Sequence, residues 1–397
     1  MMRFDRLQRI IHPSGHGAFF TERIIQEGKA DFIVVYDCGS FDNYPIEQKL
    51  LANEVNEFIN AGDKIDILFI SHFDSDHVNG IKHLTPYLSS RTKLVMPFSY
   101  EYFYLPKNSP ILEYMSMVMG IADDLSVRSY WVRYADIPNS ESPSGDNAPL
   151  DSSDISEGFL NSGTRIGSVL SSDRDRRFKW IYVPFNLYDD RQYREKFEAE
   201  VKARFIKEAK DIGALDLDKE AIEKLRDIYK SLGPYATKEV KDSTRKANGS
   251  KNINYNSLIV LSKATHYNCH CYGHFPYRHL ACRHRLFGGY CDGACLYTGD
   301  SNLGKPEYVV RLDSVLRRYT ELPICLFQLP HHGSRQYYCN RLLRAYDMYT
   351  NLFVNCGQYD FNQKSFPQMP ADVEAAGRNM QMVTGQKYCR LEQEVEF

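Results

Sequence analysis

The stretch SHFDSDHVNG, residues 71–80, places two histidines and two aspartates within six positions. It follows residues 65–70 (IDILFI), a short run dense in branched apolar residues, which predicts a buried strand. Beyond Asp76 the apolar residues at positions 78, 81, 84 and 88 have helical spacing, so a helix is expected to begin there. Four polar side chains are therefore expected where a buried strand gives way to a helix.

These four side chains are expected to converge on a metal ion. In the extended part of the stretch the alternating residues His72, Asp74 and Asp76 point to one side, and His77 joins them from the start of the helix. A mixture of imidazole and carboxylate ligands is typical of Zn²⁺, Mn²⁺ or Fe sites. The alternative is a polar loop before a capped helix, with Asp74 or Asp76 as the N-cap. That alternative accounts for one aspartate but not for four ligand-type residues.

Composition restricts the classes of protein to consider. The 397 residues are 43% hydrophobic and 25% charged, as in an ordinary soluble globular protein. The length allows one large domain with insertions or two domains, and we predict the first, a single domain over residues 1–397. A net charge of −2 gives no overall attraction to nucleic acid, so binding would need a local basic patch, best represented by residues 238–251.

The sequence also predicts where the protein is found. No apolar run approaches the length of a membrane span, and the N-terminal residues lack the apolar core of a secretory signal. We therefore expect a cytoplasmic protein without a membrane partner. In that compartment the ten cysteines are expected to be free or metal-bound.

Strands and helices are expected to alternate along the chain, which favours an α/β layered fold. The expected helices are residues 45–59 and 110–122. The expected strands, of which the final one is taken as the last core strand, are residues 18–25, 32–36, 65–70, 93–96, 180–185, 256–261, 294–297, 324–329 and 352–355. Residues 138–158, rich in Ser, Asp, Pro and Gly, are expected to form a mobile loop. Residues 189–252 are expected to form an inserted helical pair with a basic linker.

Acidic and histidine residues recur where the expected strands end. Asp37, Asp300 and the pair His331-His332 each follow such a strand, as does the stretch 71–80. A sheet could gather all of them at one edge, which is where ligand sites of α/β proteins belong.

A second concentration of ligand-type residues lies in residues 264–295, which are expected to form a Cys/His-rich hairpin insertion. Five of the ten cysteines and five of the twelve histidines fall within residues 266–295. Cys291 and Cys295 have zinc-ligand spacing, and Cys282 with His284 could contribute the other pair of a structural zinc site. The alternative is a loop with incidental thiols, because the pattern matches no standard zinc finger.

These segments together resemble the metallo-β-lactamase fold, and most closely the soluble metal-binding domain of ComEC-type DNA-uptake proteins. Asp74 stands where the usual signature of the fold has a histidine, as is typical of the ComEC-like branch. The resemblance covers about residues 20–105, 160–185 and 253–367. The matching segments follow the family's order: GHGAFF (15–20), YDCG (36–39), SHFDSDHVNG (71–80), YNSLIVL (255–261), LYTGD (296–300) and LPHHGS (329–334).

The resemblance implies an αββα sandwich with a cleft for one or two divalent metals, Zn²⁺ or Mn²⁺, at the sheet edges. It assigns His72 and Asp74 to one metal position, Asp76 and His77 to the other, and Asp300 to a bridge between them. One histidine of the pair His331-His332 completes the site, and the resemblance leaves open which one. Asp37 is implied to orient a metal-bound imidazole from outside the ligand shell.

One departure from the branch concerns the segment after the last expected core strand. The usual Gly-His-Pro is replaced there by Ser365-Phe366-Pro367, so that a ligand of the second metal is missing. In addition, outside the Cys/His-rich segment there is no clear separate histidine ligand between His77 and Asp300. A degenerate, non-catalytic metal-binding module that contacts a protein partner is therefore one alternative function.

By resemblance, the expected activity is that of a phosphodiesterase or nuclease that cleaves DNA through a metal-activated hydroxide. With His331 taken as the metal ligand, Asp76, Asp300 and His332 are the expected catalytic residues. Asp300 positions the hydroxide, and His332 donates a proton or contacts the phosphate. A further alternative is a hydrolase of a small substrate such as a cyclic nucleotide, lactone or thioester.

Overall fold

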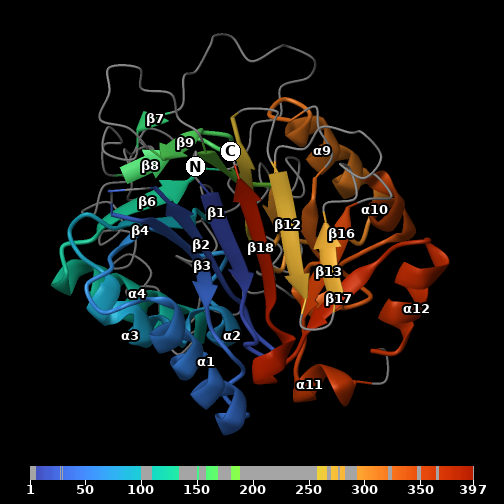
Figure 1. Ribbon diagram of the computed structural model, residues 1–397, viewed down its shortest axis with the longest axis horizontal. Helices are drawn as coiled ribbons and strands as arrows, with labels where there is room; N and C mark the ends of the chain where they lie inside the picture. The colour runs from blue at the N-terminus through green and yellow to red at the C-terminus, as the bar shows by residue number, and fades with distance from the viewer. Residues whose placement is uncertain are drawn as a thin grey trace, which may run out of the picture.

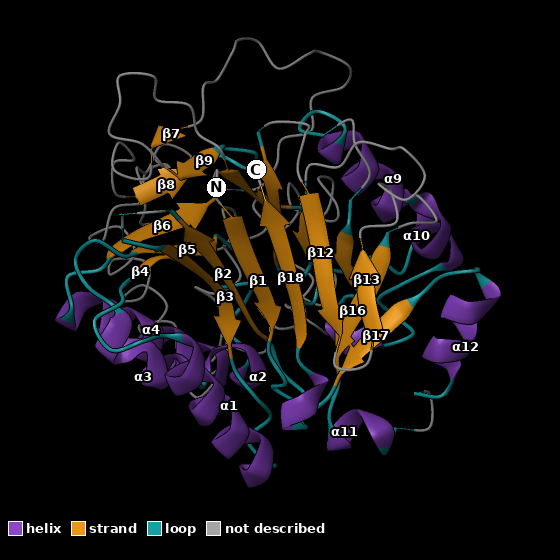
Figure 2. Ribbon diagram, viewed as in Figure 1, coloured by secondary structure: helices purple, strands orange, loops and turns teal. Residues whose placement is uncertain are grey.

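The computed structural model describes residues 6–26, 28, 30–99, 110–133, 150–151, 158–168, 180–187, 257–265, 270–275, 278–281, 293–320, 324–346, 350–363 and 366–396. Two mixed β-sheets and flanking helices make up this part of the chain (Figures 1 and 2). The expected α/β class is confirmed.

The first sheet runs β13-β12-β18-β1-β2-β3-β4-β5-β6-β8. In this spatial order, neighbouring strands from β13 through to β3 pair antiparallel. Neighbouring strands from β3 through to β8 pair parallel. The bounds are β1 (Arg6–Ile11), β2 (Phe19–Ile25), β3 (Phe32–Cys38), β4 (Ile65–Phe69), β5 (Lys93–Pro97), β6 (Arg128–Val132), β8 (Gly158–Leu160), β12 (His270–Phe275), β13 (Arg278–Ala281) and β18 (Leu391–Glu396).

The second sheet runs β17-β16-β15-β14-β11-β10-β9-β7. Its strands from β14 to β17 are parallel, as is the pair β7 and β9, and the remaining pairs are antiparallel. The bounds are β7 (Leu150–Asp151), β9 (Ile166–Ser168), β10 (Trp180–Asn186), β11 (Leu258–Ala264), β14 (Cys295–Tyr297), β15 (Leu326–Gln328), β16 (Asn351–Asn355) and β17 (Met380–Val383).

Apolar side chains divide into three buried clusters that define the layers. Between the sheets, Phe20 and Tyr36 of the first sheet stack on Tyr297 of the second, with ring centroids 5.4 and 5.1 Å apart. A second cluster joins the outer face of the first sheet to α1 (Pro45–Phe58), α3 (Ile81–Leu84) and α4 (Pro110–Asp124). A third joins the second sheet to α9 (Pro306–Leu316), α10 (Asn340–Ala345) and α12 (Gln368–Ala375). Helices therefore lie outside a pair of sheets.

The structure matches most of the expected elements and adds several. The nine expected strands correspond to β2, β3, β4, β5, β10, β11, β14, β15 and β16, and the two expected helices to α1 and α4. The expectation that residues 352–355 form the last core strand is wrong, because β17 pairs with β16 and β18 pairs with β1. In β18 buried residues alternate with partly exposed ones, among them three glutamates, so its apolar signal is weak.

The helix expected after Asp76 is broken into short pieces. These are α2 (Ser75–Val78), α3 and the 3₁₀ turn η1 (Thr85–Tyr87). The break falls at Asn79-Gly80, where a Cβ on Gly80 would lie 2.6 Å from a methyl group of Leu51. Glycine is needed there because the turn packs directly against α1. Among the described helices, none has both the length and the apolar character needed to cross a bilayer.

The expected insertions are covered only in part. Residues 189–252 lie outside the described residues. Of residues 138–158, expected as a loop, residues 150–151 form β7 and Gly158 begins β8, so a loop is wrong for these positions. The segment 264–295 contains the hairpin β12–β13, and β12 extends the first sheet beyond β18. Its last residue, Cys295, is the first residue of a core strand.

The buried carboxylate of Glu54 on α1 makes the stability of the fold depend on pH. Glu54 accepts hydrogen bonds from Nδ1 of His12 at 2.9 Å and from the Arg390 guanidinium at 2.7 Å. Burial alone would raise the pKa of Glu54, but these two partners lower it. Because the folded-state pKa is lowered, its contribution to stability is present above the ordinary glutamate pKa of about 4.3 and is lost as the pH falls through the folded value.

We expect Glu54→Gln to lower the free energy of unfolding at pH 7 by about 1.5–3 kcal/mol, the usual worth of hydrogen bonds to charged groups. Urea unfolding between pH 7 and pH 3 should show a shallower loss of stability in the variant than in the unmodified chain. Glu113→Gln, at an exposed position of α4, serves as the control. Parallel pH profiles for the Glu54 variant and the unmodified chain would contradict this account.

Candidate metal centre

The candidate site lies where strands of both sheets end. In the first sheet, Asp37 lies near the end of β3, and the stretch 71–80 follows β4. In the second sheet, Asp300 follows β14 and the turn η5 (His331–Gly333) follows β15. A hydrogen bond joins the two sheets here, in which the Leu258 N–H donates to the Ser71 carbonyl at 2.8 Å. The expected gathering of these segments at one edge is therefore observed.

His72, His77 and Asp300 form the first group of buried ligand-type residues. Nε2 of His72 lies 3.6 Å from Oδ2 of Asp300, and Nε2 of His77 lies 3.3 Å from Oδ1 of the same carboxylate. These two nitrogens and Oδ1 are buried, and none has a hydrogen-bond partner among the described residues. Buried polar atoms are rarely left in this way, so three of them facing one another indicate a place for a cation.

The other ring nitrogens of this group are held by the protein. Nδ1 of His77 donates to Oδ2 of Asp37 at 2.8 Å, and Asp37 also accepts the Ser71 backbone N–H and hydroxyl at 2.7 and 2.6 Å. Nδ1 of His72 lies 2.9 Å from the Ser71 hydroxyl and 3.2 Å from that of Ser257. Such contacts fix the ring orientation and direct Nε2 inward, as is usual for metal-ligating histidines.

Asp76, His77 and His332 form a second, overlapping group. Nε2 of His332 lies 3.0 Å from Oδ2 of Asp76, and Nε2 of His77 lies 3.7 Å from the same oxygen. Nδ1 of His332 donates to the Asn355 carbonyl at 3.1 Å. His77 thus stands between the carboxylates of Asp76 and Asp300, so the two groups form one continuous site.

The electrostatics of the site favour positive charge between the carboxylates. Burial would lower the pKa of His332, but the hydrogen bond with Asp76 and nearby carboxylates raise it to about 9. Burial and the neighbouring His77 instead lower the pKa of His72 to about 4. Burial would raise the pKa of Asp76, but the surrounding histidines lower it, so its carboxylate stays ionised.

Backbone strain is concentrated at the site. Among the described residues, four that are not glycine have positive φ, and three of them belong here: Asp37 (54°), His331 (49°) and His332 (53°). This conformation costs of order 1–3 kcal/mol for each such residue and persists where the surrounding structure holds it. His331 and His332 are consecutive, but the His332 side chain is buried and that of His331 is partly exposed.

The geometry distinguishes the two histidines that the sequence left undecided. His332 is buried among ligand-type residues, whereas the His331 side chain is 27% exposed and stacks on Tyr337 at a centroid distance of 3.9 Å. Nδ1 of His331 contacts Oδ2 of Asp300. His332 therefore belongs to the groups of possible metal ligands and His331 lies at their rim, whereas His331 was the ligand expected from the sequence.

Two further expectations differ in detail from the observed grouping. Asp74, expected to share a metal position with His72, is 32% exposed, and its Oδ2 lies 3.8 Å from Nε2 of His72. It is not a member of the first group. Phe366, which replaces an expected ligand, packs against the core of the second sheet and against Phe361 at 4.9 Å.

The candidate structural zinc site receives no support from its one described residue. Cys295 is fully buried in β14 between the sheets, and burial raises the pKa of its thiol to about 12. A thiol in such surroundings is a poor source of the thiolate that zinc requires. Cys282, His284 and Cys291 lie outside the described residues.

Sequence reasoning missed two residues at this site, His16 and Asp360. With His332 they form a third group of ligand-type residues, although His16 belongs to the loop before β2 and Asp360 to α11 (Gln358–Phe361). A histidine between two glycines in the segment GHGAFF was a signal for His16. Asp360 carries no comparable local pattern.

The chain matches no protein-family model and no curated protein sequence.

The Asp37 carboxylate provides a test of the site that leaves its proposed ligands intact. Asp37→Asn is expected to lower the affinity for Zn²⁺ about 10–100-fold, the usual effect of losing a carboxylate behind a ligating histidine. Asparagine tolerates the left-handed backbone found at this position, so the fold should be retained. Isothermal titration with Zn²⁺ measures the change, and the exposed Asp124→Asn is the control. Equal affinities for both variants would show that Asp37 does not support a metal site.

Proposed function

We propose that this chain is a metal-dependent hydrolase of the metallo-β-lactamase type that cleaves phosphodiester bonds, with DNA as its substrate. The observation that carries the proposal is the convergence of buried atoms of His72, His77 and Asp300 that have no hydrogen-bond partner among the described residues. The sequence resemblance and the arrangement of helices outside two mixed sheets support the family assignment. The one or two metals of this class are Zn²⁺ or Mn²⁺.

The residues present fit a divalent cation. His72, His77 and Asp300 would hold one ion, and Asp76 with His332 would contribute to a second position beside it. When bound, such ions supply an activated water and offset the charge of a phosphodiester. The choice of DNA follows from Asp74, which replaces the usual histidine as in the ComEC-like branch.

The chain's own residues supply orientation and proton transfer. The Asp300 backbone N–H donates to the Ser257 hydroxyl at 2.9 Å, which sets the position of its carboxylate between His72 and His77. His331 is held at the rim by Tyr337, and its Nδ1 is engaged by Asp300. Its Nε2 is therefore the atom able to give a proton to the leaving oxygen. In this arrangement His331 takes the proton-transfer role and His332 the ligand role.

The proposed activity is tested by incubating the purified chain with plasmid, single-stranded DNA, RNA and a cyclic nucleotide, each with Mn²⁺ or Zn²⁺. We expect cleavage of DNA. A chelator should stop this cleavage, and adding the metal back should restore it. Hydrolysis of the cyclic nucleotide alone would replace this proposal by a small-substrate hydrolase. Metal binding without hydrolysis of any substrate would support a non-catalytic module.

A further inference from the structure

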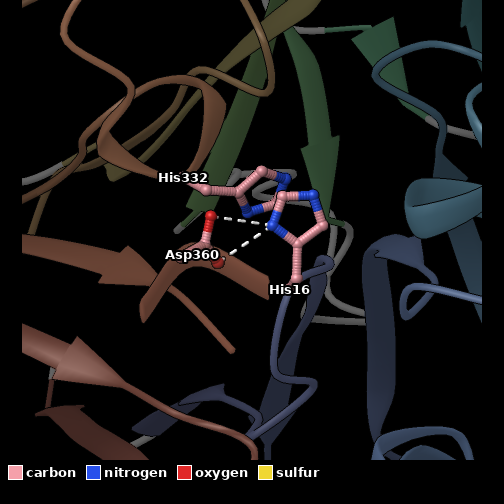
Figure 3. A group of neighbouring side chains, drawn as sticks. All are labelled: His16, His332 and Asp360. Carbon is pink, nitrogen blue, oxygen red and sulfur yellow. Dashed lines mark hydrogen bonds and ion pairs between the residues drawn. The ribbon is translucent and has the colours of Figure 1, made fainter. Parts of the chain in front are cut away.

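His16 lies beside the second group of ligand-type residues and is held there by Asp360. Its Nδ1 lies 2.9 Å from each carboxylate oxygen of Asp360, and its ring packs against that of His332 with centroids 4.0 Å apart (Figure 3). The His16 side chain is only 12% exposed. Asp360 is buried and also accepts the Gly357 N–H at 2.8 Å, so its carboxylate is fixed in turn.

The free end of the His16 ring points toward Asp76. Its Nε2 lies 3.5 Å from Oδ2 of Asp76, the same oxygen that lies 3.0 Å from Nε2 of His332. One carboxylate oxygen is thus approached by two imidazole nitrogens from separate loops. Two imidazoles and a carboxylate form a donor set that suits zinc.

His16 follows the same pattern as the other histidines of the site. In His77 and His332, as in His16, Nδ1 is held by a carboxylate or a carbonyl, and in His72 it is held by hydroxyl groups. In all four, Nε2 is the nitrogen that faces the ligand-type carboxylates. A ligating histidine usually donates its other N–H to such a partner, which raises its basicity.

The loop that carries His16 is tightly packed around this position. Glu47 of α1 accepts the His16 backbone N–H at 3.2 Å and the Gln358 backbone N–H at 3.0 Å, which ties the His16 loop to α11. Gly15 has φ +69°, and a Cβ there would lie 2.2 Å from the Glu47 carboxylate. A Cβ at Gly357 would lie 2.5 Å from the same carboxylate. Only glycine allows this close packing, and the packing brings His16 and Asp360 together.

We propose that His16 is a ligand of the second metal position, together with Asp76 and His332, and that Asp360 orients its imidazole. This assignment rests on the proposed metal-dependent function. His16 then supplies the imidazole that the sequence lacks at Phe366, from a loop at the other end of the chain. The site would bind two divalent ions rather than one.

The test is a titration of the chelator-treated, full-length chain with Co²⁺ and Zn²⁺, followed by visible absorption and by calorimetry. The unmodified chain is expected to bind two equivalents. His16→Ala should retain the first equivalent and weaken the second more than 100-fold, since loss of a ligand exceeds the 10–100-fold effect of losing its supporting partner. Asp360→Asn should weaken only the second equivalent, by about 10–100-fold.

His83→Ala is the matched control, because His83 on α3 belongs to none of the three ligand-type groups. Circular dichroism checks that each variant is folded, and Asp360→Asn decides the question if His16→Ala does not fold. A single equivalent in the unmodified chain, or an unchanged second equivalent in the folded variants, would overturn the assignment of His16. Two equivalents that depend on His16, without hydrolysis of any substrate, would leave it standing while the proposed activity fails.

Discussion

Asp300→Ala is expected to abolish tight metal binding at the first position and to reduce DNA cleavage more than 100-fold. The Asp300 carboxylate faces Nε2 of both His72 and His77, and its Oδ1 is buried without a hydrogen-bond partner among the described residues. Removal of a partner behind a ligand costs about 10–100-fold, and removal of a ligand costs more. Zinc content of the purified variant and its cleavage rate on plasmid DNA measure the two effects.

The Asp300 result is interpretable because the variant should fold. Asp300 lies in the turn after β14, outside the apolar clusters, and alanine removes a buried charge that is costly to desolvate. Asp313→Ala on α9, where Asp313 pairs with the exposed Arg317 at 3.0 Å, is the control and should behave as the unmodified chain. Wild-type zinc content and cleavage in folded Asp300→Ala would remove the basis of the proposed function.

Arg9→Met is expected to lower the free energy of unfolding by about 3–5 kcal/mol, the usual cost of leaving one partner of a buried ion pair alone. Arg9 of β1 is fully buried, and its Nε donates to Glu22 of β2 at 2.7 Å. The guanidinium also donates to Tyr297 at 3.1 Å and to Ser262 at 3.2 Å, both on the second sheet. It further contacts Gln393 of β18, so Arg9 joins three neighbouring strands and both sheets.

Urea unfolding measures this loss, and a double variant identifies its cause. Because most of the cost arises from an unpaired Glu22, Arg9→Met with Glu22→Leu should recover part of the stability lost in Arg9→Met alone. Arg317→Met, at a largely exposed position, should change the free energy of unfolding by less than about 1 kcal/mol. A double variant no more stable than Arg9→Met would show that the unpaired Glu22 carboxylate is not the main source of the lost stability.

Local sequence patterns were sufficient for the strands that carry the site. The apolar run 65–70 and the polar residues after it were recognisable because strand burial and strand ends leave a signal within a few positions. The same reasoning located Asp37, Asp300 and the histidine pair at strand ends. It failed for β18, since three glutamates alternate with its buried residues, and for β17, which lies beyond the strand taken as the last.

The ligand assignment within the site could not be obtained in this way. His331 and His332 are adjacent in sequence and chemically identical, yet the His332 side chain is buried and that of His331 is partly exposed. The role of a histidine depends on which atoms hold its Nδ1. For His332 that atom is the carbonyl oxygen of Asn355, 23 positions away.

Local sequence patterns were enough to predict the α/β class and the strand ends that carry ligand-type residues. Only the fold shows that His16 and Asp360, 344 positions apart, meet beside His332, and that Cys295 lies in the core. The physical reason is that apolar periodicity is a local property of the chain. The partners of a buried polar group are set by sheet order and loop packing, which bring distant segments together.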